Sequence, residues 1–134
     1  EEAFWNNFNK HQNFLKEITG KDCTIFRFPG GSHNTLVRNA HGSSFTENII
    51  LKLNEQGINC YDWNVDSGDA KGNNIPATTI YNNVVKDSKD KDGHLKSPAI
   101  VLMHDCMTKT TTVEALPKII EYFKEQGYKF DTLN

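Results

Sequence analysis

The chain has 134 residues, which is near the usual size of one domain and enough to bury a core. Its formal net charge of −2 and its pI of about 6.2 give no basic surface for nucleic acid or an anionic membrane, so we expect neither partner. No apolar run approaches the roughly 20 residues of a membrane-spanning helix, and the first residues lack the charged and apolar regions of a signal peptide.

The sequence contains three cysteines, Cys23, Cys60 and Cys106. Their number is odd, no two are spaced as CxxC, and each lies beside an apolar segment. This pattern predicts buried thiols rather than a disulfide or a metal site, and it leaves the redox compartment open.

Four segments repeat apolar residues at helical spacing. They run from Glu2 to Thr19, from Ser44 to just before Gly57, from Pro76 through Val85, and from Thr111 to just before Gly127. Ser44 with Glu47, and Thr111 with Glu114, have the spacing of capping boxes. The last helix is expected to bury Val113, Leu116, Ile119, Ile120 and Phe123. Its Pro117 should kink the helix or delay its start.

Four shorter segments alternate with these helices and have strand patterns. They are Thr24–Phe28, Asn59–Val65, Ala99–Met103 and Tyr128–Leu133. Ala99–Met103 is continuously apolar, as expected for a central strand covered on both faces, whereas Ser32–His41 is polar and predicts a loop. The alternating order predicts an α/β fold with parallel strands and right-handed crossovers.

Three predicted strands lead into side chains that can carry chemistry. Arg27 precedes a corner formed by Pro29 and Gly30-Gly31, whose backbone N–H groups can point into open space, while Asp69 and His104 follow the next two strands. The C-terminal ends of neighbouring parallel strands share one edge, so Arg27, Asp69 and His104 could meet there. An imidazole at this position can transfer a proton near neutral pH.

The same residues also have simpler explanations. His104 and the adjacent Asp105 could only bond nearby backbone at a strand end. Arg27, predicted to be buried, could form a structural ion pair, and Asp69 could belong to an ordinary turn. Gly30-Gly31 could cradle a phosphate in a nucleotide-binding α/β domain, although the pattern lacks a third Gly and a Lys.

Several motifs together resemble a known family. They are Arg27-Phe-Pro-Gly-Gly-Ser32, Asp62-Trp-Asn-Val-Asp-Ser-Gly-Asp-Ala70, Leu102-Met-His-Asp105, Ala115-Leu-Pro-Lys-Ile-Ile120 and Gly127-Tyr-Lys-Phe130. In this order they resemble the second half of a polysaccharide deacetylase (NodB homology) domain of carbohydrate esterase family 4. The resemblance implies that residues 1–134 form the C-terminal part of one such domain, whose fold is an irregular (β/α) barrel.

The resemblance also implies roles for residues of this chain. Arg27 would hold the catalytic carboxylate, and Gly30, which follows Pro29, would donate its backbone N–H to the oxyanion that forms when water attacks the acetamide carbonyl. His104 would act as general acid toward the leaving amine, supported by Asp69.

Leu102 would line the pocket for the acetyl methyl group. The implied reaction is hydrolysis of N-acetyl or O-acetyl groups on a polysaccharide such as peptidoglycan or a chitin-like glycan. A non-catalytic carbohydrate-binding or interaction module with the same fold is the alternative. The family also implies a secreted or cell-surface protein.

The family's metal motifs, Thr-Phe-Asp-Asp and His-x-x-x-His, do not occur in this sequence. His33 and His41 are eight residues apart and do not reproduce the second motif. We therefore expect a divalent metal, zinc, in the intact domain, with no ligand from this chain. The strand Thr24–Phe28 would then have a bare edge, so we expect the chain to bind its own N-terminal half or another copy, or to be poorly soluble.

Overall fold

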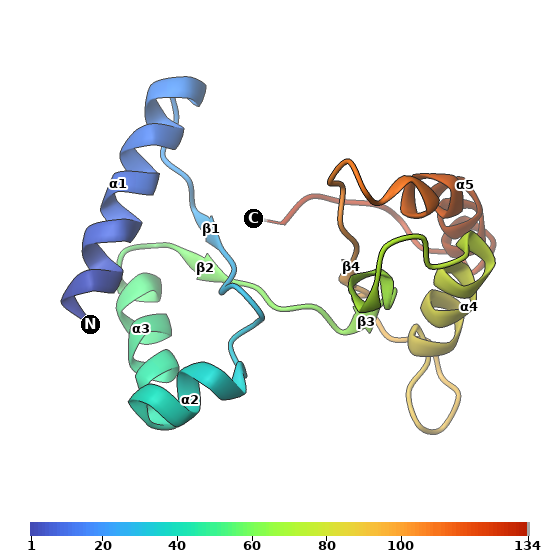
Figure 1. Ribbon diagram of the computed structural model, residues 1–134, viewed down its shortest axis with the longest axis horizontal. Coiled ribbons are helices and arrows are strands. Elements are labelled where there is room, and N and C mark those ends of the chain that lie inside the picture. Colours follow the sequence, from blue (N-terminus) through green and yellow to red (C-terminus); the bar gives the residue numbers. More distant parts are fainter. Residues whose placement is uncertain (134) are drawn as a thin grey trace. The chain divides into compact units, whose positions relative to one another are not determined.

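The computed structural model describes residues 1–133. They divide into two compact units, one of Glu1–Asp62 with Leu133 and the other of Trp63–Thr132. Figure 1 labels the helices and strands of both units. Among the described residues, no helix is long and apolar enough to cross a membrane.

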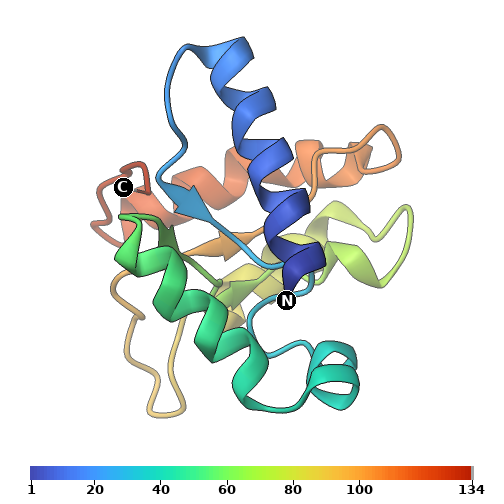
Figure 2. The same cartoon turned by 90° about the vertical axis from the view of Figure 1, so that its left-hand side faces the viewer.

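The first unit contains three helices and one pair of short parallel strands. Its elements are α1 (Glu2–Thr19), β1 (Ile25–Phe26), α2 (Thr35–His41), α3 (Ser44–Glu55) and β2 (Asn59–Cys60). The strand register pairs Ile25 with Asn59 and Phe26 with Cys60. Helices α1 and α3 share one core with this strand pair, and Figure 2 shows both helices beside it. The buried residues of that core are Phe8, Ile49, Leu53 and Ile58.

The second unit also combines a parallel strand pair with helices. Its elements are β3 (Val65–Asp66), the 3₁₀ turn η1 (Asp69–Lys71), α4 (Ala77–Asp87), β4 (Val101–Leu102) and α5 (Thr110–Glu125). The register pairs Val65 with Val101 and Asp66 with Leu102. The core of this unit lies between α4, α5 and β3. Its buried residues are Val65, Ile80, Val84, Ala115, Ile119, Tyr122 and Phe123.

The predicted α/β class with parallel strand pairing is confirmed, but the strands are shorter than expected. The segment Asn59–Val65 is not one strand, because its two ends pair in different units. Val101 and Leu102 are only partly buried, so the prediction that Ala99–Met103 is covered on both faces was wrong. Within the described residues, Tyr128–Leu133 contains no strand.

The predicted loop Ser32–His41 was wrong, because Thr35–His41 forms α2. The side-chain oxygen of Asn34 accepts the backbone N–H of Leu36 at 2.9 Å, which caps the first turn, and Gly42 ends the helix. This helix escaped prediction because it buries no residue, so its sequence has no apolar periodicity.

The predicted capping boxes were also wrong. Ser44 and Thr111 lie inside α3 and α5, and neither helix has a side-chain cap. Helix α5 runs through Pro117. It buries Thr112, Ala115, Ile119, Tyr122 and Phe123, whereas Val113 is 63% exposed and Leu116 37% exposed. The predicted apolar face was therefore correct only toward the end of the helix.

Candidate functional site

Two predicted site residues, Asp69 and His104, contact each other directly. The parallel strands β3 and β4 both end at one edge, where η1 begins with Asp69 and the chain after Leu102 reaches His104. Asp69 Oδ1 lies 2.8 Å from Nδ1 of His104, and Asp69 Oδ2 accepts the backbone N–H of His104 at 2.8 Å. The carboxylate of Asp69 is 1% exposed and the imidazole 43% exposed.

The protonation state of Asp69 determines how the imidazole is held. Burial by itself would raise the pKa of this carboxyl, but hydrogen bonds from the side chain and backbone of His104 and from Thr112 outweigh it, so the pKa lies below its ordinary value. An ionised carboxylate only accepts hydrogen bonds, so Nδ1 of His104 must be the donor. This bond orients the ring through Nδ1 and leaves the other ring nitrogen, Nε2, available for proton transfer.

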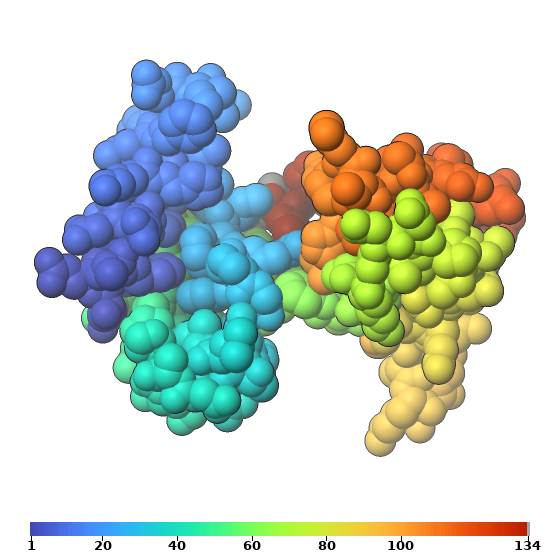
Figure 3. Space-filling model, viewed as in Figure 1, coloured from blue at the N-terminus to red at the C-terminus, as the bar shows by residue number. Residues whose placement is uncertain are grey.

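The loop after His104 forms part of the surface of its unit, coloured orange in Figure 3. Asp105 is exposed, so the carboxylate that holds the imidazole is Asp69 and not the sequence neighbour. Cys106 is also exposed, which corrects the prediction that it is buried, while Cys23 and Cys60 are partly buried. All three cysteines are free thiols.

The predicted oxyanion corner lies in the first unit. Gly30 and Gly31 have φ values of 73° and 82°, which favour glycine, and a Cβ on Gly30 would lie 2.5 Å from the side chain of Asn34. Ser32 closes the corner, because its backbone N–H donates to Asp62 Oδ1 at 2.9 Å and its hydroxyl donates to Oδ2 of the same carboxylate. Asp62 thus fixes the turn that carries Gly30.

Arg27 differs from its prediction. Its side chain is exposed rather than buried, and its Nε donates to the backbone carbonyl of Tyr61 at 3.4 Å. Because Arg27, Pro29 and Gly30 belong to a different unit from His104, their meeting at one site stays a prediction. Leu102 lies in the same unit as His104, is partly buried, and pairs with Asp66.

The described residues contain one group whose side chains could share a metal ion. Asp90, Asp92 and His94 are all exposed, and their potential ligand atoms lie within 4.8 Å of one another. Asp90 Oδ1 already accepts the backbone N–H groups of Asp92 and His94, both at 2.9 Å, which is ordinary turn chemistry. The group includes neither Asp69 nor His104, so it does not fit a metal that acts with that pair.

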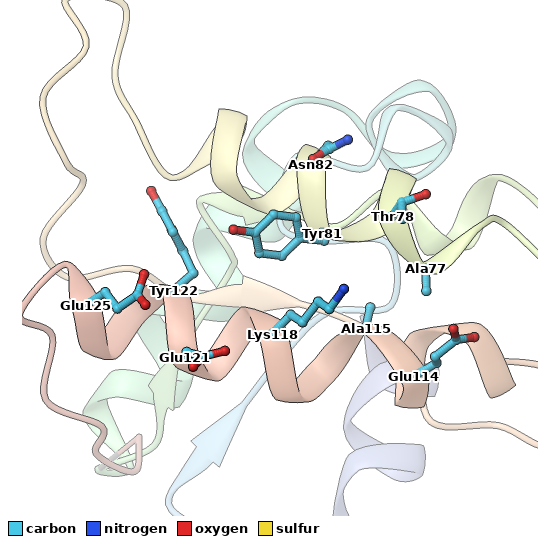
Figure 4. Close-up of a pocket in the computed structure, with 10 residues that line it drawn as sticks. All are labelled: Ala77, Thr78, Tyr81, Asn82, Glu114, Ala115, Lys118, Glu121, Tyr122 and Glu125. Atoms are coloured by element: carbon cyan, nitrogen blue, oxygen red, sulfur yellow. The ribbon is translucent and has the colours of Figure 1, made fainter.

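A groove of about 560 Å³ lies between α4 and α5. Figure 4 shows Lys118 of α5 extending toward Tyr81 of α4. The groove is lined by Ala77, Thr78, Tyr81, Asn82, Glu114, Ala115, Lys118, Glu121, Tyr122 and Glu125. Since neither Asp69 nor His104 lines it, we assign the candidate active site to the Asp69–His104 pair and not to this groove.

Comparison with known proteins shows what the chain is similar to. No protein-family model matches it. A Bacillus cereus protein named peptidoglycan-N-acetylglucosamine deacetylase is 30% identical over 130 residues, which are 94% of this chain and 41% of that protein. The solved catalytic domain of a peptidoglycan N-acetylglucosamine deacetylase from Eubacterium rectale matches with a TM-score of 0.80 and 30% identity, over 99% of this chain and 57% of that one.

A third match is a mutant of a CE4 family pseudoenzyme with restored enzymatic activity. It has a TM-score of 0.62 and 26% identity, over 90% of this chain and 36% of that one. The chain spans about two fifths of the length of the first curated relatives it matches. The resemblance drawn from the motifs is confirmed: over most of its length the chain is similar to proteins named peptidoglycan deacetylases and to solved structures of carbohydrate esterase family 4, and it spans only part of each.

Proposed function

We propose that the protein to which this chain belongs hydrolyses acetyl groups on a polysaccharide, either N-acetyl or O-acetyl groups of peptidoglycan or of a chitin-like glycan. The observation that carries this proposal is the half-exposed imidazole of His104 held by the buried carboxylate of Asp69. The names of the relatives support peptidoglycan as the substrate class.

His104 would act at the step in which an amide substrate breaks. Water adds to the acetamide carbonyl while the catalytic carboxylate of the intact site accepts a proton from it. The C–N bond then breaks, with its electron pair moving to the sugar nitrogen. That nitrogen needs a proton, which Nε2 of the imidazolium donates while Nδ1–H remains bonded to Asp69. Acetate and a free amine are the products.

Other residues would hold the substrate and the charge that develops on it. The backbone N–H of Gly30 would stabilise the oxyanion, and the turn closed by Asp62 and Ser32 supports this because it keeps the corner in one conformation. Leu102 would contact the acetyl methyl group. Arg27 would orient the catalytic carboxylate of the intact site.

The intact domain would also contain a divalent metal, zinc in our proposal. Its ligands would come from outside this chain, because the described Asp90, Asp92 and His94 do not fit the role. When bound, such an ion would polarise the acetyl carbonyl and the attacking water. A peptidoglycan substrate would place the protein outside the cell or at its surface.

The test is acetate release by the protein produced with all of its encoded sequence. We expect acetate from N-acetylated peptidoglycan fragments or chitin oligomers in the presence of zinc, and none from residues 1–134 alone. The negative control is the same oligomer after chemical removal of its N-acetyl groups, which should yield no acetate. Absence of acetate from every acetylated glycan would contradict the proposal.

The alternative is a non-catalytic carbohydrate-binding or interaction module. It is favoured by the match to a CE4 family pseudoenzyme, since that relative shows a similar fold in a protein that lacks activity unless mutated. Glycan binding without acetate release by the whole protein would support this alternative, whereas acetate release would exclude it.

A further inference from the structure

We infer that Thr112, in the first turn of α5, is a positioning residue for His104, because its hydroxyl holds the Asp69 carboxylate that orients the imidazole. Its kinetic consequences rest on the function proposed above, but the geometry is independent of it. The inference depends on three features: the bonds that Asp69 accepts, the burial of Thr112 and the place of Thr112 in the fold.

The carboxylate of Asp69 accepts hydrogen bonds from two separate segments of the chain. After β4, His104 donates its backbone N–H to Oδ2 and its Nδ1–H to Oδ1. From α5, the Oγ1 hydroxyl of Thr112 donates to the same Oδ2 at 3.0 Å. An aspartate attached only to the group that it orients could rotate together with that group. A donor from a separate helix fixes the carboxylate plane independently of His104.

Thr112 is placed for this task by the helix that carries it. Its side chain is 5% exposed, so its hydroxyl has little access to water as a competing partner. Helix α5 begins at Thr110 and packs its buried face against α4 and β3. Thr112 is the first buried residue on that face.

A neighbouring residue anchors the backbone of the same aspartate. Lys109 is 9% exposed, and its Nζ donates to the carbonyl oxygens of Asp69 and Gly72 at 2.6 Å and 2.7 Å. The side chain of Asp69 is therefore held by Thr112 and its main chain by Lys109, both at the start of α5. Neither residue follows from the motifs, because the sequence pattern did not assign Thr112 to the buried face of this helix and Lys109 precedes the helix.

The test compares two substitutions that remove different parts of Thr112. Thr112→Val replaces the hydroxyl by a methyl group of similar shape, whereas Thr112→Ser keeps the hydroxyl and removes the methyl. If Thr112 positions Asp69, the Val variant is the damaged one. If Thr112 only fills space, the Ser variant is the damaged one. Thr110→Val, at an exposed position in the same turn, is the matched control.

In the protein produced with all of its encoded sequence, we expect Thr112→Val to lower kcat for acetate release about tenfold with KM unchanged, the scale of one hydrogen bond to a charged group. Thr112→Ser and Thr110→Val should stay within about twofold of the wild type. Equal kcat values in Thr112→Val and the wild type would overturn the inference, as would a larger loss in Thr112→Ser than in Thr112→Val.

A second measurement decides the matter even if the protein releases no acetate. The ¹⁵N shifts of the His104 ring, identified by their loss in His104→Ala, report which ring nitrogen carries the proton. In the neutral form of the ring, we expect the Nδ1–H tautomer in the wild type and in Thr112→Ser, and a mixture of tautomers in Thr112→Val. An unchanged tautomer in Thr112→Val would refute the positioning role. Absent acetate release with the expected tautomers would refute only the proposed function.

Discussion

Asp69 is almost fully buried, yet its pKa lies below its ordinary value. Burial raises the pKa, and the donors on His104 and Thr112 more than compensate for it. A group whose pKa is depressed on folding contributes stability above its unfolded pKa, and this contribution is lost as the pH falls through the folded pKa. The ionised carboxylate therefore both orients His104 and stabilises its unit at neutral pH.

Asp69→Asn should destabilise the protein by roughly 1–3 kcal/mol at pH 7, because a neutral amide replaces a charged acceptor and must place an N–H₂ group among donors. Since the ordinary pKa of Asp69 is 3.8, the wild type should lose this advantage as the pH falls below that value. Urea unfolding at pH 7 and near pH 3 measures the difference between the two proteins at each pH.

Asp105→Asn is the matched control, because Asp105 is an exposed aspartate next to His104. Its free energy of unfolding should follow the wild type at both pH values. A stability gap between wild type and Asp69→Asn that is as large near pH 3 as at pH 7 would show that the charge of Asp69 is not what stabilises the fold.

At the residue scale, the sequence predicted the pair but not its support. Asp69 and His104 follow parallel strands, and the general rule that such strand ends share an edge brought them together correctly. Thr112 could not be found in this way, because a threonine inside a helix has no sequence signal for a distant partner. Arg27 was predicted to be buried but is exposed, because an apolar strand pattern does not determine which side chains are covered.

At the element scale, the start of α5 also holds the η1 turn through Lys109. No side chain caps it, and Lys109, at the capping position, instead directs its ammonium group to the carbonyls of Asp69 and Gly72. This contact joins α5 to the η1 turn across about 40 residues of sequence. We expect it to be a main determinant of how that turn is held.

Lys109→Met should lower the free energy of unfolding by about 2 kcal/mol, because it leaves two carbonyl oxygens without their charged donor. Lys118→Met, an exposed lysine of the same helix, is the control and should change stability by less than about 0.5 kcal/mol. Chemical denaturation of both variants provides the comparison. Equal effects of the two substitutions would mean that the carbonyl contacts of Lys109 contribute nothing.

The positions of helices with an apolar face were predicted well, because packing against a core requires apolar residues at helical spacing and that spacing is visible in the sequence. Helix α1 begins and ends as expected, since Gly20 has φ of 71° and closes it with an αL cap. Helix α2 was missed because a local bond from Asn34, and not burial, starts it. Strand lengths were overestimated, because apolar residues continue beyond the two paired positions of each strand.

At the scale of the whole molecule, the described residues form two units, each built on one parallel strand pair. The chain matches 57% of a solved deacetylase domain over 99% of its own length. The similarity to polysaccharide deacetylases could be predicted from motif order, because several motifs in the right order are far more specific than any one of them. The arrangement of Arg27 and Gly30 around His104 could not be predicted, since it depends on how the units come together.

The measurement that tests the account most directly is turnover and metal content of His104→Ala in the protein with all of its encoded sequence. A positioned general acid contributes on the order of 10²-fold or more, so we expect kcat for acetate release to fall by at least about that factor. Metal content should stay at the wild-type level, and His11→Ala, an exposed histidine on α1, should retain full activity. Wild-type turnover in His104→Ala, or loss of metal together with activity, would contradict the role assigned to His104.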